Sequence, residues 1–241
     1  MALDEALMES VREGGEPVLR FYRWEPACLS LGRNQPAAGM YREDRLAAEG
    51  WDVVRRPTGG RAVLHDRELT YSVVTPSGML GSPRASYAAV NGALVAGLRR
   101  LGVPAVLQPR TSTRAPVPSL APCFRDPAEG EVVVEGRKLI GSAQYREGGV
   151  VLQHGSLLLE GDQRRVADLL REPRPEEEPT ATLASYLDPL PTWEVLVDDM
   201  VAGWSTSIGT VRPREAPTPH EIERAEALTS RYTDPAWTWH R

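Results

Sequence analysis

The sequence has few cysteines, no leader-like start and no long apolar run. Two cysteines in 241 residues, Cys28 and Cys123, cannot form a disulfide framework. No apolar run has the length that a membrane-spanning helix requires. No signal peptide opens the chain, because an amphipathic pattern begins within residues 1–7. We therefore expect a cytoplasmic protein in which both thiols are reduced.

Several motifs of common enzyme classes are also missing. There is no G-x-x-x-x-G-K-[ST] phosphate loop, no G-x-G-x-x-G dinucleotide turn and no G-x-S-x-G nucleophile elbow. The four histidines, His65, His154, His220 and His240, are scattered without the spacing of metal ligands, so we expect no metal site. These absences argue against α/β-hydrolases, Rossmann enzymes and metalloenzymes.

Composition is ordinary for a globular protein, with 41% hydrophobic and 25% charged residues. The net charge of −5 argues against non-specific nucleic-acid binding as the main activity. The length suits one sizeable core, and we see neither an internal repeat nor a domain boundary. We therefore expect residues 1–241 to form one catalytic domain.

Hydrophobic periodicity predicts interspersed helices and strands. The expected helices cover residues 2–12, 40–49, 84–101, 162–170, 192–204 and 219–231. The expected strands cover residues 17–24, 27–31, 51–54, 69–74, 105–108, 131–135, 138–145 and 149–159. The last three strands are joined by tight turns, which predicts an antiparallel meander. Gly102 should end one helix and Asp162 should cap another, and the tail with Trp237 and Trp239 should dock on the body. The pattern predicts an α+β fold with a mixed or antiparallel sheet.

A glycine turn, Thr58-Gly59-Gly60, follows Arg55-Arg56-Pro57 and precedes Arg61. Its two glycines allow a sharp bend or close approach of a ligand to the backbone. Exposed amides beside arginines suit an anion or a polarised carbonyl. The alternative is an ordinary hairpin turn with solvated arginines.

A second informative stretch runs from Cys123 to residue 156. Cys123 lies in a Pro-, Ser- and Thr-rich loop, where a thiol can reach a substrate, and Arg125 or Lys138 nearby would lower its pKa. Lys138 at the start of a strand would polarise a carbonyl or stabilise an oxyanion. The small residues 141–143 allow close approach of a ligand. The alternative is an inconsequential loop cysteine and a surface lysine. Cys28 is expected to be a packing residue.

Three segments resemble the signatures of the lipoate–protein ligase, octanoyltransferase and biotin–protein ligase superfamily. Residues 55–66 resemble the first signature, residues 136–144 the second, which carries the family lysine, and residues 151–156 the third. The opening residues 1–7 and the closing segment to Trp239 are also similar to this family. The resemblance extends over nearly the whole chain and implies a biotinyl/lipoyl-transferase-like α+β domain of the class II synthetase-like type.

Within the superfamily, the surroundings of Cys123 upstream of Lys138 resemble the LipM type of octanoyltransferase. The resemblance implies transfer of an octanoyl group from acyl carrier protein to a lysine of the glycine-cleavage H protein. It implies Cys123 as the nucleophile that forms an acyl thioester, with ping-pong kinetics, and Lys138 as the residue that contacts the acyl carbonyl. The implied substrate-binding residues are Arg55, Arg56, Thr58, Gly59, Gly60, His65, Gly141, Ser142, Ala143, His154 and Gly155.

The same resemblance implies the partners. They are octanoyl-acyl carrier protein and the H protein or other lipoyl domains, with no nucleic acid, no membrane and a monomeric chain. No cofactor is expected, because exchange between thioesters is nearly thermoneutral and needs no ATP. Because these partners are acidic, a basic patch of Arg55, Arg56, Arg61 or Arg114 would steer them.

Three alternatives remain open. An ATP-dependent lipoate ligase would need ATP and Mg²⁺, but Arg61 stands where many such ligases have a third glycine. The chain also looks too short for their extra carboxy-terminal domain. An amidotransferase would take its octanoyl group from the H protein, and an idle scaffold would only bind acyl groups. The family commonly has a strand before the first helix, so either the start is assigned late or that strand is missing.

Overall fold

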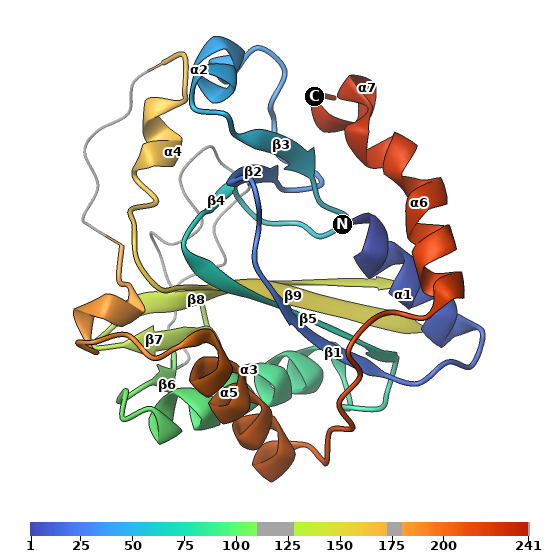
Figure 1. Cartoon of the computed structure of the whole chain (residues 1–241), viewed down its shortest axis with the longest axis vertical. Coiled ribbons are helices and arrows are strands. Elements are labelled where there is room, and N and C mark those ends of the chain that lie inside the picture. The colour runs from blue at the N-terminus through green and yellow to red at the C-terminus, as the bar shows by residue number, and fades with distance from the viewer. Residues whose placement is uncertain (110–127, 173–179, 241) are drawn as a thin grey trace.

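Two β-sheets of unequal size form the framework of the protein (Figure 1). The computed structural model describes residues 1–109, 128–172 and 180–240. The main sheet is antiparallel throughout, in the order β1 (Val18–Tyr22), β5 (Glu68–Pro76), β9 (Val150–Leu158), β8 (Arg137–Glu147), β7 (Val132–Val134) and β6 (Val106–Leu107). The small sheet is mixed, in the order β3 (Asp52–Arg55), β2 (Cys28–Leu31) and β4 (Val63–His65).

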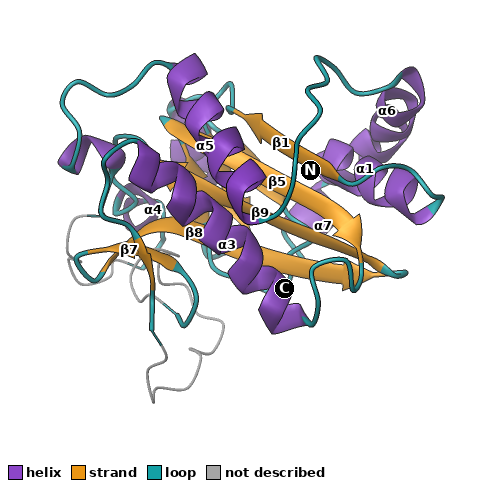
Figure 2. Cartoon of the chain, turned by 90° about the horizontal axis from the view of Figure 1, so that it is seen from below, coloured by secondary structure: helices purple, strands orange, loops and turns teal. Residues whose placement is uncertain are grey.

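Helices cover both faces of the main sheet. The helices are α1 (Ala2–Arg12), α2 (Glu43–Ala48), α3 (Pro83–Arg100), α4 (Arg165–Asp168), α5 (Trp193–Ser207), α6 (Pro219–Thr233) and α7 (Pro235–Thr238), with a 3₁₀ turn at Leu183–Ser185. Figure 2 shows α3 and α5 in front of the strands of the main sheet. The small sheet lies on the opposite side (Figure 1), and α1 also packs there, against β5 and β9.

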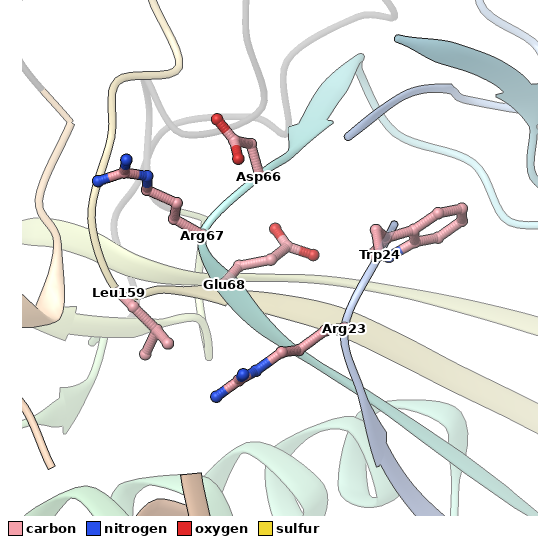
Figure 3. A pocket seen from close by; sticks show the side chains of 6 residues that line it. All are labelled: Arg23, Trp24, Asp66, Arg67, Glu68 and Leu159. Atoms are coloured by element: carbon pink, nitrogen blue, oxygen red, sulfur yellow. The ribbon is translucent and has the colours of Figure 1, made fainter. Parts of the chain in front are cut away.

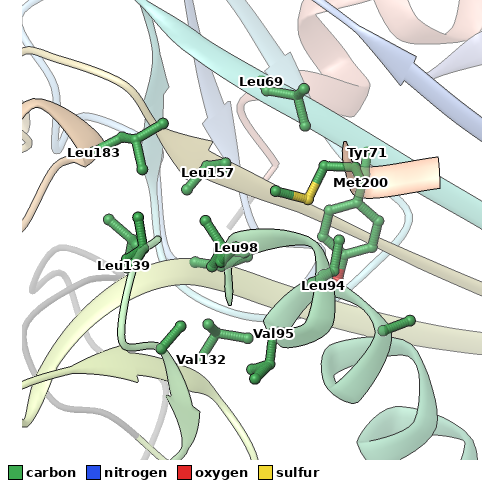
Figure 4. Close-up of a cluster of buried hydrophobic side chains, with 14 of the residues drawn as sticks. Leu69, Tyr71, Leu94, Val95, Leu98, Val132, Leu139, Leu157, Leu183 and Met200 are labelled. Atoms are coloured by element: carbon green, nitrogen blue, oxygen red, sulfur yellow. The ribbon is translucent and has the colours of Figure 1, made fainter. Parts of the chain in front are cut away.

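The largest core lies between the main sheet and the helices α3 and α5 (Figure 4). Leu69 and Leu157 from the sheet meet Leu94 and Leu98 from α3, and Met200 joins them from α5. All five side chains are buried, so each contributes roughly 1.5–3 kcal/mol relative to an exposed position. This core fixes one face of β5, β8 and β9, which leaves their other face to carry a site.

The helices α3 and α5 approach each other through glycine. A Cβ atom at Gly203 would lie 2.3 Å from the backbone nitrogen of Gly97. A Cβ atom at Gly97 would in turn lie 2.9 Å from Cα of Met200. Such distances exclude any side chain at either position without separating the helices, so glycine sets the spacing of this helix pair.

The α+β fold, the meander β7–β8–β9 and the helices other than the one expected over residues 162–170 are confirmed. Gly102 follows Leu101, the C-cap residue of α3, and adopts φ +86°, as expected for a glycine that ends a helix. Two predictions are wrong. The helix expected over residues 162–170 is reduced to α4, whose N-cap is Arg164, while Asp162 accepts the amide of that residue at 2.9 Å. The glycine turn is not a hairpin, because β3 and β4 pair with opposite edges of β2.

Within the described ranges, no helix combines the length and the apolar character needed to cross a lipid bilayer.

Candidate active site

The glycine turn (residues 58–60) joins β3 to β4 and packs against the loop after β2. A Cβ atom at Gly32 would lie only 2.0 Å from the carbonyl oxygen of Gly60. The amide of Arg33 donates to the carbonyl oxygen of Thr58 at 2.8 Å. Gly60 has φ +100°, a conformation that disfavours other residues. The turn is therefore held closely by its neighbour along one side.

The side chain of Arg56 connects the glycine turn to β2 through hydrogen bonds. Its side chain is buried, and Nη1 donates to both the carbonyl oxygen and Oγ of Ser30 at 3.0 Å. Nη2 donates to the carbonyl oxygens of Gly59 at 2.9 Å and Arg61 at 2.7 Å. The guanidinium thus satisfies carbonyl groups of the turn itself. Whether Arg56 also contacts a substrate stays a prediction.

Arg55 connects the glycine turn to the carboxy-terminal segment. Its fully buried guanidinium donates to the carbonyl oxygens of Gly32 at 2.6 Å, Thr238 at 2.9 Å and His240 at 2.9 Å. The indole of Trp237 donates to the carbonyl oxygen of Arg55 at 2.9 Å, so this tryptophan docks on the body as predicted. These contacts give Arg55 a structural role, and its contact with a substrate stays a prediction.

The predicted basic surface patch is wrong in two of its four members. Arg55 and Arg56 are 0% and 4% exposed, so neither can attract a partner at the surface. Both side chains donate hydrogen bonds to carbonyl oxygens in the interior instead, because a buried guanidinium must donate its N–H groups to acceptors. Arg61 is half-buried, and Arg114 lies outside the described residues.

His154 joins the main sheet to the glycine turn. It lies on β9 with 5% of its surface exposed, and its Nε2 is 2.7 Å from Oγ1 of Thr58. Its Nδ1 is 3.2 Å from Oδ2 of Asp4, on α1. Asp4 is fully buried and accepts from Arg20 at 2.6 Å. Burial would raise the pKa of Asp4, but Arg20 and His154 hold it well below its usual range.

The ionised Asp4 decides the tautomer of His154. A carboxylate only accepts hydrogen bonds, so Nδ1 of His154 carries the proton. Nε2 is then free to accept from the hydroxyl of Thr58. Burial lowers the pKa of His154, which favours this neutral ring.

The second and third signatures pair directly across the ladder of β8 and β9. Ala143 lies opposite His154, and Ser142 lies opposite Gly155. A Cβ atom at Gly155 would lie 2.3 Å from the carbonyl oxygen of Gly141, so only glycine fits there. Because His154 also contacts Thr58, the structure brings residues of all three signatures together where the glycine turn meets the main sheet.

Ser142 belongs to a polar cluster beneath α3. Its hydroxyl accepts from the hydroxyl of Tyr71 at 2.7 Å and donates to Oδ1 of Asn91 at 3.1 Å. Gln153 donates to both of these partners, at 3.1 Å and 3.0 Å. Burial raises the pKa of Tyr71 to about 12, so it remains a neutral donor. The side chain of Ser142 therefore faces α3, away from the glycine turn.

His65 is buried on β4 and has hydrogen-bond partners different from those of His154. Its Nδ1 lies 2.6 Å from Oε1 of Glu68, and its Nε2 lies 2.7 Å from Oγ of Ser30. The indole of Trp24 stacks on the imidazole with the ring centroids 4.6 Å apart. The contacts of the imidazole ring described above are thus with Glu68, Ser30 and Trp24. Its predicted contact with an acyl chain stays a prediction.

Lys138 forms a buried ion pair with Glu131. Its Nζ lies 2.6 Å from Oε1 of Glu131, and both residues are buried. The alternative of a surface lysine is therefore wrong. Lys138 precedes Gly141 by three residues on β8, close to the paired signatures. Cys123 and Arg125 lie outside the described residues, so their distance from Lys138 stays untested.

Asp4, Glu68 and Glu131 were missed by the sequence reasoning. Asp4 lies in the opening segment that resembles the family, and that likeness was the one signal that could have found it. Glu68 follows the first signature by two residues, and Glu131 precedes Lys138 by seven. Nothing in the local pattern distinguishes either carboxylate from a surface residue.

A separate hollow lies beside Glu68 (Figure 3). It is lined by Arg23, Trp24, Asp66, Arg67, Glu68 and Leu159. No group of three or more possible metal ligands occurs in the part of the chain that the structure describes.

Solved structures define the class of this fold. A lipoate protein ligase of T. acidophilum with bound lipoic acid superposes with a TM-score of 0.81 and 25% identity, over 100% of this chain and 92% of that chain. A lipoate-protein ligase A bound with ATP has a TM-score of 0.81 and 25% identity, over 99% and 92%. The fold is that of the lipoate–protein ligases.

A family model narrows this class further. The lipoyl protein ligase A/B catalytic domain matches residues 1–204, and the chain belongs to this family. The octanoyltransferase LipM of Kyrpidia tusciae is 41% identical over 258 residues, covering 100% of this chain and 94% of the relative. That of Staphylococcus epidermidis is 34% identical over 261 residues, with the same coverage. The predicted family and the predicted octanoyltransferase activity in protein lipoylation are thus confirmed.

Proposed function

We propose that the chain moves an octanoyl group from acyl carrier protein to a lysine of a lipoyl-accepting protein, through a thioester on Cys123. The glycine-cleavage H protein is the proposed acceptor, and other lipoyl domains are further candidates. The whole chain, residues 1–241, acts as the catalytic unit, and the cytoplasm is its proposed location. One solved neighbour is a bipartite lipoate protein ligase studied with its E2 lipoyl domain, which supports an acceptor of this kind.

The observation that carries the proposal is the meeting of the three signatures. Thr58 contacts His154 at 2.7 Å, and His154 lies directly opposite Ala143. The buried Lys138 lies on the same strand as Ala143. The contact between Thr58 and His154 joins the glycine turn to the small residues of β8, and Lys138 lies on the same strand, five residues before Ala143. An acyl carbonyl needs this combination of close backbone approach and positive charge.

The chemistry proceeds in two steps. The thiolate of Cys123 attacks the carbonyl carbon of the octanoyl thioester, the bond from that carbon to the carrier's sulfur breaks, and the carrier leaves as thiolate. The neutral amine of the acceptor lysine then attacks the new thioester, an amide forms, and Cys123 leaves as thiolate. The acceptor nitrogen loses one proton before the attack and a second one as the amide forms, and both go to solvent or to a nearby base. Lys138 stabilises the oxyanion of each tetrahedral intermediate.

Cys28 is a poor candidate for the nucleophile. It is 1% exposed in a cluster with Val54 and Tyr232. Burial raises the pKa of its thiol to about 12, so the thiolate is scarce at neutral pH. Cys123 is the other thiol in the sequence, and the proposed nucleophile is therefore assigned to it.

One observation favours a second candidate, the ATP-dependent lipoate ligase. The lipoate-protein ligase A that superposes at a TM-score of 0.81 is bound with ATP, so the fold itself accommodates a nucleotide. Against the ligase stand the full-length relatives, which are named octanoyltransferases. By the resemblance, Arg61 also stands where many such ligases have a third glycine, and a side chain there would crowd an adenylate.

The test is a transfer assay with three donors. The protein is incubated with unmodified H protein and either octanoyl-acyl carrier protein, octanoyl-H protein from a second source, or lipoate with ATP and Mg²⁺. Mass spectrometry then measures the modified acceptor. We expect octanoylated H protein when octanoyl-acyl carrier protein is the donor and ATP is absent. Product only with lipoate and ATP would establish the ligase, and product only from octanoyl-H protein the amidotransferase. No product from any donor would leave an acyl-binding scaffold.

A further inference from the structure

Two buried hydrogen-bond chains of the same design connect to the glycine turn. Each consists of a carboxylate, a histidine and a hydroxyl group. In both chains Nδ1 of the histidine faces the carboxylate and Nε2 faces the hydroxyl. One chain is Asp4–His154–Thr58, and the other is Glu68–His65–Ser30.

The first chain reaches the turn directly. Thr58 is itself the first residue of the glycine turn and is fully buried. Its hydroxyl donates to His154, whose orientation Asp4 fixes from α1. Arg20 on β1 holds the far side of Asp4 at 2.6 Å. This chain therefore runs from the edge of the main sheet to the turn.

The second chain reaches the turn through Arg56. Ser30 lies between His65 and Arg56, with its Oγ 2.7 Å from Nε2 of the histidine and 3.0 Å from Nη1 of the arginine. Arg56 then donates to the carbonyl oxygen of Gly59. At the other end, Glu68 accepts from the hydroxyls of Thr70 and Ser156, which lie on β5 and β9.

The turn needs such support because its own sequence restricts its backbone conformation very little. Apart from its chain neighbours, no described residue comes within 4 Å of where a Cβ atom at Gly59 would stand, and Gly60 has φ +100°. Glycine has the widest choice of backbone conformations of any residue, so a turn with two of them has no strong intrinsic shape. Its position must be set from outside, and both chains connect it to the main sheet.

We propose that His65 and His154 are positioning residues, which fix the glycine turn relative to strands β5 and β9 through Ser30–Arg56 and Thr58. The inference rests on the proposed function in one respect, that the turn contacts the octanoyl group. A fixed turn holds its amides where the acyl carbonyl will lie, and such pre-organisation is a large part of electrostatic catalysis. The expected kinetic effect of losing a chain is a slower acylation of Cys123 with little change in donor half-saturation.

The first experiment compares Thr58→Val with Thr58→Ser. Valine keeps the shape of threonine and removes the hydroxyl that His154 accepts from, whereas serine keeps that hydroxyl. Hydrogen–deuterium exchange is followed by mass spectrometry on peptides covering residues 56–62. We expect faster exchange in Thr58→Val and protection close to wild type in Thr58→Ser. Thr206→Val, an exposed threonine of α5 on the opposite face of the main sheet, is the matched control.

The second chain is tested by Ser30→Ala, with Ser30→Thr as the variant that keeps a hydroxyl. We again expect faster exchange over residues 56–62 in the alanine variant alone. Circular dichroism confirms that each variant is folded before exchange is measured. Unchanged exchange in both Thr58→Val and Ser30→Ala would overturn the proposal, because neither chain would then hold the turn.

Kinetics complete the test. We expect Thr58→Val to lower the rate constant of Cys123 acylation about 10- to 100-fold, as for misplaced reacting groups, with donor half-saturation changed less than about threefold. A variant that is merely less stable would keep the wild-type rate per folded molecule, and that result would contradict the inference. If wild type itself transfers no acyl group, the proposed function fails, and the exchange data still decide the positioning role.

Discussion

The ammonium of Lys138 lies 2.6 Å from Oε1 of Glu131, and both side chains are buried. Glu131 also accepts the amide of Ala128 at 2.7 Å through its other oxygen, so the carboxylate is held at both ends. The pair fastens the residue before β7 to the first part of β8. It holds the proposed oxyanion-stabilising group in place inside the protein.

Removal of Glu131 should therefore affect both stability and chemistry. Glu131→Ala leaves the buried ammonium without its carboxylate, which costs about 3–5 kcal/mol of unfolding free energy. Glu131→Gln keeps a hydrogen-bond acceptor and should cost less. Urea denaturation measures both values. Equal stability of Glu131→Ala and wild type would contradict a stabilising role for the pair of Lys138 and Glu131.

Arg55→Lys should destabilise the protein although it keeps the charge. The guanidinium reaches Gly32, Thr238 and His240 at once, whereas a lysine ammonium is a compact point charge that cannot span them. Each carbonyl left unpaired in the interior costs about 1–3 kcal/mol. We expect a lower urea midpoint and earlier proteolysis after residue 233. A lysine variant with an unchanged midpoint and protease pattern would refute this anchoring role.

Gly203→Ala and Gly92→Ala form a matched pair of helix substitutions. At Gly203 the new methyl group would lie 2.3 Å from the backbone of α3, so we expect a loss of about 1–3 kcal/mol through overpacking. At Gly92 no atom of the described residues beyond the helix's own backbone comes within 4 Å of the new Cβ, so alanine should stabilise α3 by about 0.4–1 kcal/mol. Thermal unfolding of the two variants should move in opposite directions. Shifts of the same sign would contradict the close contact of α3 and α5.

Burial of His154 predicts a pH-dependent stability. Its folded pKa lies below its unfolded value of about 6.5. As pH falls below that value the unfolded chain takes up a proton that the folded chain refuses, so stability declines, by up to about 1.4 kcal/mol per pH unit for one group. His154→Gln should remove this decline between pH 7 and 5, whereas the exposed His220→Gln should keep it. An undiminished decline in His154→Gln would show that other groups cause it.

The depressed pKa of Asp4 acts at lower pH. Asp4 contributes stability above its unfolded pKa, and this contribution is lost as pH falls toward its folded pKa. In Asp4→Asn, stability should therefore fall less steeply with decreasing pH below about pH 4, which is the pKa of an aspartate in the unfolded chain. Urea midpoints measured across this range test the sign.

Much of the fold followed from the sequence because its signals are local. The periodicity of α3 and the turns between β7, β8 and β9 depend on neighbouring residues, and the structure confirms them. The small sheet did not follow. Strand β4 has only three residues, and it pairs with β2 rather than with a sequence neighbour. Pairing between distant segments leaves no periodic trace in so short a strand.

The site was predictable in composition and less so in arrangement. The motifs placed Thr58 and His154 in one site, and the structure shows their contact. Arg55 and Arg56 read as surface charges, because the sequence cannot show how many carbonyl groups surround a side chain. The partners Asp4 and Glu131 come from other elements, and only the folded chain brings them to His154 and Lys138.

The most direct test of the central claim is the intact mass of the protein after incubation with octanoyl-acyl carrier protein in the absence of ATP. Wild type and Cys28→Ala should both gain one octanoyl group that hydroxylamine removes, and Cys123→Ala should gain none. An adduct that persists in Cys123→Ala, or no adduct on wild type, would contradict a thioester on Cys123.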